Sequence, residues 1–154
     1  MEIKKLNKRP GIDADKKLGR ALIQFEGLLT ELRKKDLPDE IAILINDGVE
    51  QTNAVSASDN GLSKQIRKAQ SGIIRLVEKE LKIVTKNHYR NSWLVIGMSA
   101  FGIPIGVAFG SSVGNMGFLG LGLPIGMVIG IAVGAGMDKK AFKNGKQLDI
   151  EIKG

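Results

Sequence analysis

Residues 97–116 read GMSAFGIPIGVAFGSSVGNM, and residues 117–136 read GFLGLGLPIGMVIGIAVGAG. The second stretch repeats the first at an offset of 20 residues, with glycine, proline, isoleucine and valine at matching places and no charged residue in either copy. About 20 consecutive apolar residues are what a helix needs to cross the hydrocarbon core of a bilayer. The sequence therefore predicts a hairpin of two transmembrane helices.

Within each copy, glycine recurs at every fourth residue. That spacing places the glycines on one face of a helix, where they leave a groove that lets another backbone approach closely. Lipid tails already solvate apolar side chains, so close van der Waals contact is the main attraction between helices in a membrane. The grooves could pack the two helices of one hairpin together or join separate copies into a homo-oligomer, and the pattern leaves both open. The expected helix-packing residues are Gly102, Gly106, Gly110, Gly114, Gly122, Gly126, Gly130 and Gly134.

Each copy also carries a proline between two glycines, Pro104 in the first and Pro124 in the second. Proline removes one backbone donor and clashes with the preceding turn, so both positions are expected to kink unless a helix begins there. A kink could act as a hinge for gating or create a broken helix around a site. A static bend that shapes helix packing is the simpler expectation.

The charged residues of the chain lie on both sides of this apolar block. The chain has 23 Lys and Arg residues against 16 Asp and Glu residues, and none of them falls within residues 91–137. Tyr89 and Trp93 stand where the charged flank meets the apolar run, a position at which aromatic rings favour the headgroup region. We therefore expect both to be interface anchors, with spans of about 92–112 and 117–137.

Basic residues precede the first predicted span and follow the second. Because Lys and Arg are retained on the cytoplasmic side of a membrane, both termini are expected in the cytoplasm and the protein in the cell inner membrane. The polar N-terminus is not followed by an apolar run at signal-peptide distance, so insertion is expected to use the internal segments. The flanking basic residues are Lys82, Lys86, Arg90, Lys139, Lys140, Lys143 and Lys146.

Before the hairpin, apolar residues recur with helical spacing. Residues 1–12 suggest a disordered basic leader, and residues 13–91 a cytoplasmic domain of three helices. The first helix has Asp13 or Asp15 placed to cap its start, and the second is expected to begin at Pro38. In the third, nothing before Trp93 compels the helix to stop, so it is expected to run on into the bilayer.

Residues 138–154 are predicted to form a basic cytoplasmic tail. Apolar and charged residues alternate in residues 148–153, as in a short half-buried strand that residues 2–4 could pair with. Chain ends are usually loose, so a charged tail that stays in water is the favoured expectation.

The sequence offers no residue set for catalysis, and we expect no enzyme activity. Cysteine is absent and His88 is the only histidine, so no thiolate or histidine cluster for a metal can form within one chain. The glycine-rich run 130–136 lacks the preceding strand and later acid of a dinucleotide fingerprint. Basic residues are spread among acids rather than gathered on one face, which argues against nucleic-acid binding. The uncharged spans disfavour proton relays and ion-coupled transport. No catalytic, cofactor-binding or metal-binding residue is therefore predicted.

The stretch GFLGLGLPIGMVIGIAVGAGMDKKA, residues 117–141, resembles bacterial glycine-zipper small membrane proteins, most of them uncharacterised. The resemblance covers residues 93 to about 143 and implies an integral membrane protein that tends to self-associate and has no assigned catalysis. Our first hypothesis is a noncatalytic homo-oligomer in the lipid bilayer that presents its helical domain to a cytoplasmic protein partner. The alternative is an oligomeric pore-forming or toxin-like membrane effector, in which the prolines permit opening.

Overall fold

The computed structural model describes residues 1–9, 11–12, 16–56 and 59–152. Across these ranges the chain is helical and contains no strand, and three helices are followed by an apolar hairpin, so the predicted all-α class and helix order are confirmed. The chain divides into two compact units. We call Met1–Thr85 with Leu148–Gly154 the helical domain, and Lys86–Gln147 the hairpin unit.

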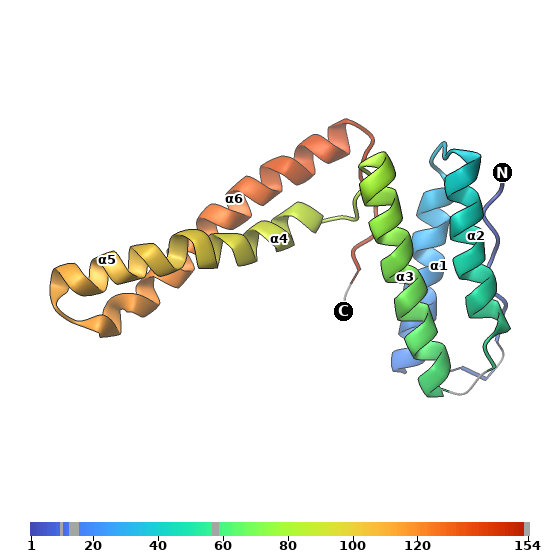
Figure 1. The fold of residues 1–154 in the computed structure, drawn as a ribbon, viewed down its shortest axis with the longest axis horizontal. Helices are drawn as coiled ribbons and strands as arrows, with labels where there is room; N and C mark the ends of the chain where they lie inside the picture. The colour runs from blue at the N-terminus through green and yellow to red at the C-terminus, as the bar shows by residue number, and fades with distance from the viewer. Residues whose placement is uncertain (10, 13–15, 57–58, 153–154) are drawn as a thin grey trace. The chain divides into compact units, whose positions relative to one another are not determined.

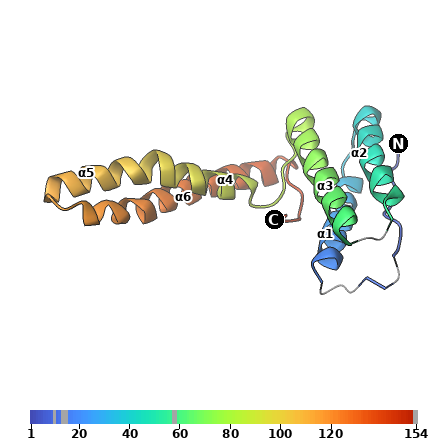
Figure 2. The ribbon, with the colours of Figure 1, turned by 60° about the horizontal axis from the view of Figure 1, so that its bottom comes forward.

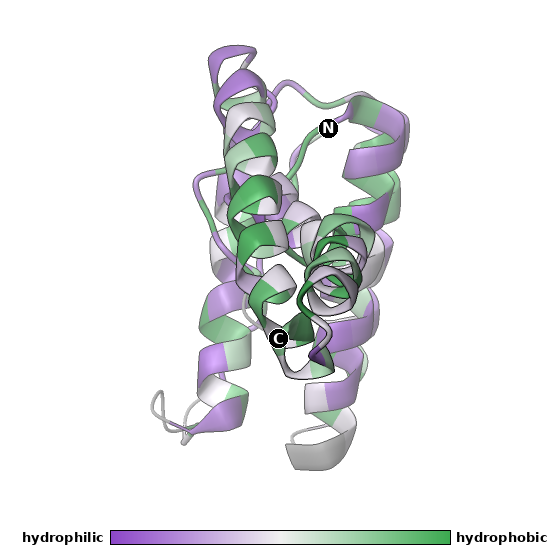
Figure 3. Cartoon of the chain, turned by 90° about the vertical axis from the view of Figure 1, so that its left-hand side faces the viewer, coloured by the Kyte–Doolittle hydropathy of each residue, from purple (hydrophilic) through white to green (hydrophobic). Residues whose placement is uncertain are grey.

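Three helices make up the helical domain: α1 (Lys17–Arg33), α2 (Asp39–Ala54) and α3 (Asp59–Leu81). They lie side by side, with α3 in contact with both others (Figures 1 and 2). Figure 3 shows hydrophilic and hydrophobic residues alternating along helices of this domain, as expected of helices that bury one face. The largest fully buried side chains of these helices are Phe25, Leu28, Leu29, Leu32, Ile45, Val49, Leu62, Ile66 and Val77.

The helix starts follow local chemistry only in part. Pro38 is the N-cap of α2, and its carbonyl accepts from the amides of Ile41 and Ala42. Asp39 and Glu40 occupy the first turn, where negative charge is favourable. Lys16 precedes α1 without a side-chain cap, and the predicted capping residues Asp13 and Asp15 lie outside the described residues.

The N-terminal leader differs from the predicted disordered segment. Ile3 is 4% exposed and belongs to the core of the helical domain. Asn46 accepts from the Lys4 amide at 2.8 Å and donates to the Glu2 carbonyl at 3.1 Å. About two helical turns further along α2, the Asn53 side chain accepts from the Asn7 amide and donates to the Lys5 carbonyl. Two asparagine side chains on one face of α2 thus satisfy the leader backbone and hold it in place.

The C-terminal segment 148–152 is also part of the helical domain, which corrects the expectation of a loose tail. The side chain of Leu148 is fully buried in the core, and its amide donates to the Val84 carbonyl at 2.9 Å. The Asp149 amide donates to Glu31 Oε2 at 3.1 Å. Ile150 packs over Gly27 so closely that a Cβ on that glycine would lie 2.8 Å from its Cδ1. The alternation of apolar residues thus buries this segment against helices, without forming a strand with residues 2–4.

The third helix ends at Leu81 instead of running into the apolar block, so that expectation was wrong. Lys82 adopts a left-handed conformation with φ of 58°, and the Ile83 amide donates to the Val77 carbonyl at 3.2 Å. Ile83 and Val84 are then buried in the helical domain. Burial of two β-branched side chains outweighs the tendency of the helix to continue.

The hairpin unit consists of two helical arms joined by a tight turn. The first arm runs through α4 (His88–Gly97), a π-helical turn at Met98–Gly102 and α5 (Ile103–Val113). The second comprises a 3₁₀ segment at Met116–Leu121 and α6 (Gly122–Lys143). The two arms lie alongside each other in both views (Figures 1 and 2). His88–Val113 and Met116–Lys143 are each long and apolar enough to cross a membrane, and they contain the predicted spans.

Candidate membrane-spanning and helix-packing site

The interior of the hairpin is built from glycine. In the two arms, the buried residues other than Asp138 and Ala141 are all glycines. Large apolar side chains point outward instead, and Val128, the most exposed of them in α6 apart from Phe142, is 67% exposed. The buried glycines are Gly97, Gly102, Gly106, Gly110, Gly122, Gly126, Gly130 and Gly134.

These glycines bring the two backbones into direct contact. A Cβ added to Gly130 would lie 2.0 Å from the Trp93 carbonyl oxygen, and one on Gly126 would lie 2.3 Å from the Gly97 oxygen. A Cβ on Gly122 would lie 2.1 Å from the Gly102 oxygen. Because real Cβ atoms do not approach other heavy atoms within 3.0 Å, even alanine at these positions requires the backbones to move apart.

The contact follows an antiparallel register along the hairpin. Gly134 lies against Tyr89 and Arg90 at one end, and Gly106 lies against Leu119 near the other. Gly110 is in looser contact, since a Cβ there would lie 3.1 Å from Met116 Sδ. In this structure the second helix of the same chain therefore occupies the glycine face of the first.

Gly114 does not pack against a helix, in contrast to its prediction. It is the C-cap of α5 with φ of 69°, and a Cβ there would meet nothing within 4 Å. Asn115 follows, its amide donates to the Gly110 carbonyl, and its side chain accepts from the Gly117 amide at 2.9 Å. Glycine is needed at position 114 because left-handed backbone ends the helix and starts the turn.

Gly97 is a packing residue that the every-fourth-residue pattern missed, because it stands five residues before Gly102. The π-helical turn at Met98–Gly102 accounts for this spacing. A π turn closes an i to i+5 hydrogen bond and so adds one residue to the turn. Gly97 and Gly102 consequently share one face, and both lie against α6. The spacing of five next to a regular series of four was the signal available in the sequence.

Both predicted kink residues lie at the beginning of α-helical segments. Pro104 is in the first turn of α5, directly after the π-helical turn. Pro124 is the third residue of α6, directly after the 3₁₀ segment. Each arm is helical on both sides of its proline, so the missing backbone donor falls at a change of helix type and not at a free helix start. The irregular turn before each proline absorbs the change in hydrogen bonding that the proline imposes.

Asp138 is a second residue that the sequence analysis did not single out. It lies on α6, is 8% exposed, and accepts from the Tyr89 amide at 3.1 Å and the Arg90 amide at 2.9 Å. These are amides of the first turn of α4, whose own N-cap residue, Asn87, makes no side-chain cap bond. A carboxylate from the second arm therefore caps the N-terminus of α4, where its negative charge interacts favourably with the helix dipole.

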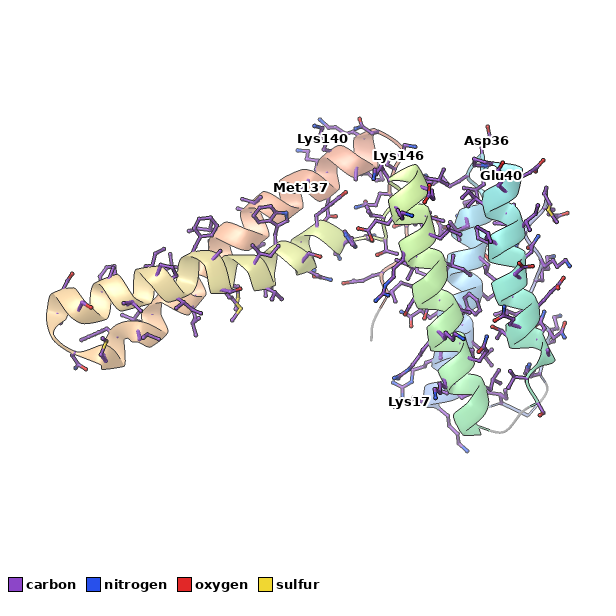
Figure 4. The ribbon with its side chains drawn as sticks, viewed as in Figure 1. Lys17, Asp36, Glu40, Met137, Lys140 and Lys146 are labelled. Carbon is purple, nitrogen blue, oxygen red and sulfur yellow. The ribbon has the colours of Figure 1, made fainter. Side chains whose placement is uncertain are left out.

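Basic residues of both arms lie at the end of the hairpin where Asp138 of α6 caps α4. Arg90 in the first arm is opposite Gly134 of the second, and Lys140 follows Asp138 on α6. Figure 4 labels Met137 and Lys140, where the apolar part of α6 gives way to its basic end. The predicted anchors Tyr89 and Trp93 belong to the same end of the first arm, and the Tyr89 ring contacts His88 edge to face, with ring centroids 5.0 Å apart.

Comparison of the chain with protein-family models, curated proteins and solved structures found no match. Within the residues that the structure describes, no group of three or more His, Cys, Asp or Glu residues could hold a metal ion.

Proposed function

We propose that this chain is a noncatalytic integral membrane protein whose hairpin unit crosses the bilayer twice and anchors the helical domain at the surface. The observation that supports this most strongly is the distribution of side chains in the hairpin, with glycine inside and large apolar residues outside. In water this arrangement would expose a long apolar surface without burying a hydrophobic core. In lipid the outer side chains are solvated, and close backbone contact supplies the attraction between the arms.

The lengths of the arms agree with this placement. The 26 residues of His88–Val113 correspond to about 39 Å of helix, against about 30 Å of hydrocarbon. The helix length beyond the hydrocarbon core would extend Arg90 and the basic end of α6 into the headgroup region. Because Lys and Arg are retained inside, we propose that both termini and the helical domain face the cytoplasm, in the inner membrane of a bacterial cell.

The role of the glycines in the proposal is to close the hairpin. Since α6 covers the glycine face of the first arm, contact between copies of the chain would have to use the opposite, lipid-facing sides. The helical domain remains available to a cytoplasmic protein partner. Its exposed apolar side chains include Ile43 and Leu44 on α2, where a partner could bind.

Single cysteines test this topology, because the natural chain contains none. In intact cells, a cysteine replacing Asn115 in the turn should react with a membrane-impermeant maleimide applied from outside. A matched cysteine replacing Lys143 should react only after the membrane is opened. The reverse pattern would invert the topology, and recovery of the wild-type chain in the soluble fraction without detergent would reject the membrane assignment.

A further inference from the structure

The leader, residues 1–9, runs along α2 (Figure 1), and side chains of α2 bind its backbone at regular intervals. Asn46 accepts from the Lys4 amide, and Asn53 accepts from the Asn7 amide. Seven residues of α-helix rise about 10.5 Å, and three residues of extended chain span about 10 Å. Because these two intervals match, α2 presents a ladder of hydrogen-bonding side chains to an extended segment that runs parallel to it.

Helix α1 binds the backbone of the same segment. Arg33 donates to the Ile3 carbonyl at 3.1 Å and to the Lys4 carbonyl at 2.8 Å, while Glu26 accepts from the Leu6 amide at 3.3 Å. Arg33 and Glu26 also pair with each other at 2.9 Å. Hydrogen bonds to the backbone fit any extended segment, and recognition of particular sequences depends on side-chain pockets.

The side chains of the leader provide that selectivity. Within residues 1–9, Ile3 is the one buried residue, at 4% exposed, and Leu6 packs against the same core. Between them, Lys4 forms an ion pair with Glu50 of α2. The surface formed by α1 and α2 therefore selects an extended segment with two aliphatic residues three positions apart and a lysine after the first.

The leader is attached to the domain without being part of its helix packing. One buried side chain and hydrogen bonds to side chains hold it, whereas the large core residues Phe25, Ile45 and Ile66 belong to the helices. A segment held in this way can leave by local opening while the helices stay packed. Exchange of an identical segment between two copies regains every contact, so it is a low-cost route to association.

We propose that the leader exchanges between copies of this chain, so that residues 1–9 of one copy bind along α2 of a second copy and link the two helical domains. Binding within one chain has the advantage of a high effective concentration. Confinement of the copies to one membrane surface raises the competing concentration of leaders from neighbours, and in this respect the proposal rests on the proposed function. The contact is separate from the glycine faces, which are covered within each hairpin.

Pairs of cysteines test the exchange, because the natural chain has none. The full chain is reconstituted in phosphatidylethanolamine–phosphatidylglycerol vesicles and treated with bismaleimidoethane. A chain carrying both Lys4→Cys and Glu50→Cys should crosslink within itself, since these two exposed side chains pair in the structure. Two differently tagged chains, one with Lys4→Cys and the other with Glu50→Cys, should give a crosslinked heterodimer. Added lipid should lower the heterodimer yield without changing the internal crosslink, because only exchange is bimolecular.

A matched pair controls for random collision between copies. Lys68→Cys places the second cysteine at an exposed position of α3, which the leader does not bind along. Combined with Lys4→Cys on the other chain, it should give only the background yield of unrelated surface positions. Recovery of the chain with the vesicles reports the membrane assignment separately, so a failure of that assignment and a failure of exchange are distinguishable.

One substitution should act in opposite directions on the two chains. Ile3→Ala on the chain with Lys4→Cys weakens the incoming leader, and the heterodimer yield should fall about ten-fold or more. Ile3→Ala on the chain with Glu50→Cys weakens the leader that competes for the acceptor surface, so the yield should rise. Lys8→Ala, on an exposed leader side chain, is the control and should change the yield in neither position.

Three results would overturn the proposal. An internal crosslink in the chain with both cysteines, without a heterodimer from the single-cysteine pair, would mean that each leader binds its own domain only. Equal heterodimer yields for Glu50→Cys and Lys68→Cys would mean random collision. A fall in yield whichever chain carries Ile3→Ala would mean that the substitution disturbs the domain and does not act on leader occupancy.

Discussion

The helical domain and the hairpin unit are both made of packed helices, yet their interiors are opposite in kind. In the helical domain, Phe25, Leu29 and Ile66 are fully buried and side chains separate the helix backbones. In the hairpin, Gly126 and Gly130 are buried and the backbones touch. Water drives large apolar groups inward, whereas lipid gives no such drive and leaves close packing as the main attraction. Under the proposed membrane placement, the surrounding solvent predicts that one unit loses stability when its interior residues shrink and the other when they grow.

Shrinking an interior residue of the helical domain should have the largest effect. Phe25→Ala removes a fully buried ring that no neighbour can replace, and we expect the free energy of unfolding to fall by about 3–5 kcal/mol. Leu44→Ala on the exposed side of α2 is the control and should change it by less than about 0.5 kcal/mol. Thermal denaturation of the full chain, followed by circular dichroism, measures both. Similar values for the two variants would mean that the domain has no side-chain core.

Enlarging an interior residue of the hairpin should come next. Gly130→Leu forces a side chain against the Trp93 carbonyl, and a penalty of about 1–3 kcal/mol is expected by analogy with overpacked cores. Val128→Leu, on the exposed outer side of the hairpin, should be nearly neutral. Disulfide yield between cysteines placed on the two arms, compared in membranes for both backgrounds, reports the separation of the arms. If crosslinking between copies falls in Gly130→Leu while crosslinking within the chain is unchanged, the glycines join copies and not arms.

The carboxylate that joins the arms gives a smaller effect. Asp138→Ala removes the acceptor for the Tyr89 and Arg90 amides, so the first turn of α4 should fray at a cost of about 0.5–2 kcal/mol. Lys139→Ala, at the neighbouring exposed position, is the control. Amide hydrogen exchange in micelles should show faster exchange at Tyr89 and Arg90 in the first variant only. Unchanged protection there would mean that the cap has no energetic role.

The smallest expected effect concerns the pH dependence of the helical domain. The Lys34 ammonium and the Asp149 amide lower the pKa of Glu31 below its ordinary value of 4.5, against the opposing effect of burial. A carboxyl group with a lowered folded-state pKa contributes stability above its unfolded pKa, and that contribution is lost as the pH falls through the folded-state value. Thermal midpoints of Glu31→Gln should therefore fall less than those of wild type between pH 5 and strongly acidic pH. If the thermal midpoints of both chains fall in parallel, Glu31 does not contribute to the pH dependence of stability.

The parts of the structure that rest on periodic patterns were predictable from the sequence. The 20-residue repeat predicts two arms, and the charge-free block predicts where they lie. The every-fourth-residue spacing selects seven glycines that face the other arm, from Gly102 to Gly110 and from Gly122 to Gly134. Gly97 escaped because a π-helical turn breaks the period. Gly114 was assigned to packing because it continues the period of four, although a glycine at this place is also a common helix end.

The features that escaped prediction depend on contacts distant in sequence. The buried leader depends on Asn46 and Asn53, two residues with no reason to attract notice on an isolated α2. In the sequence Asp138 is one charge in a basic flank, and its capping role depends on the Tyr89 amide, which is 49 residues away along the chain. The end of α3 at Leu81 follows from the burial of the next residues in a core that the sequence does not locate.

The position of Leu148 in the core also has a consequence for biosynthesis. The helical domain is interrupted by the whole hairpin unit, and its last core residue is translated after both arms. Until then the nascent domain lacks the burial of one leucine, about 1.5–3 kcal/mol, and the hydrogen bond to Val84. The three helices can collapse early, but the domain reaches its full stability only once the hairpin has left the ribosome. Completion of the domain is therefore coupled to synthesis of the hairpin, and a chain truncated after Lys86 lacks the final piece of its core.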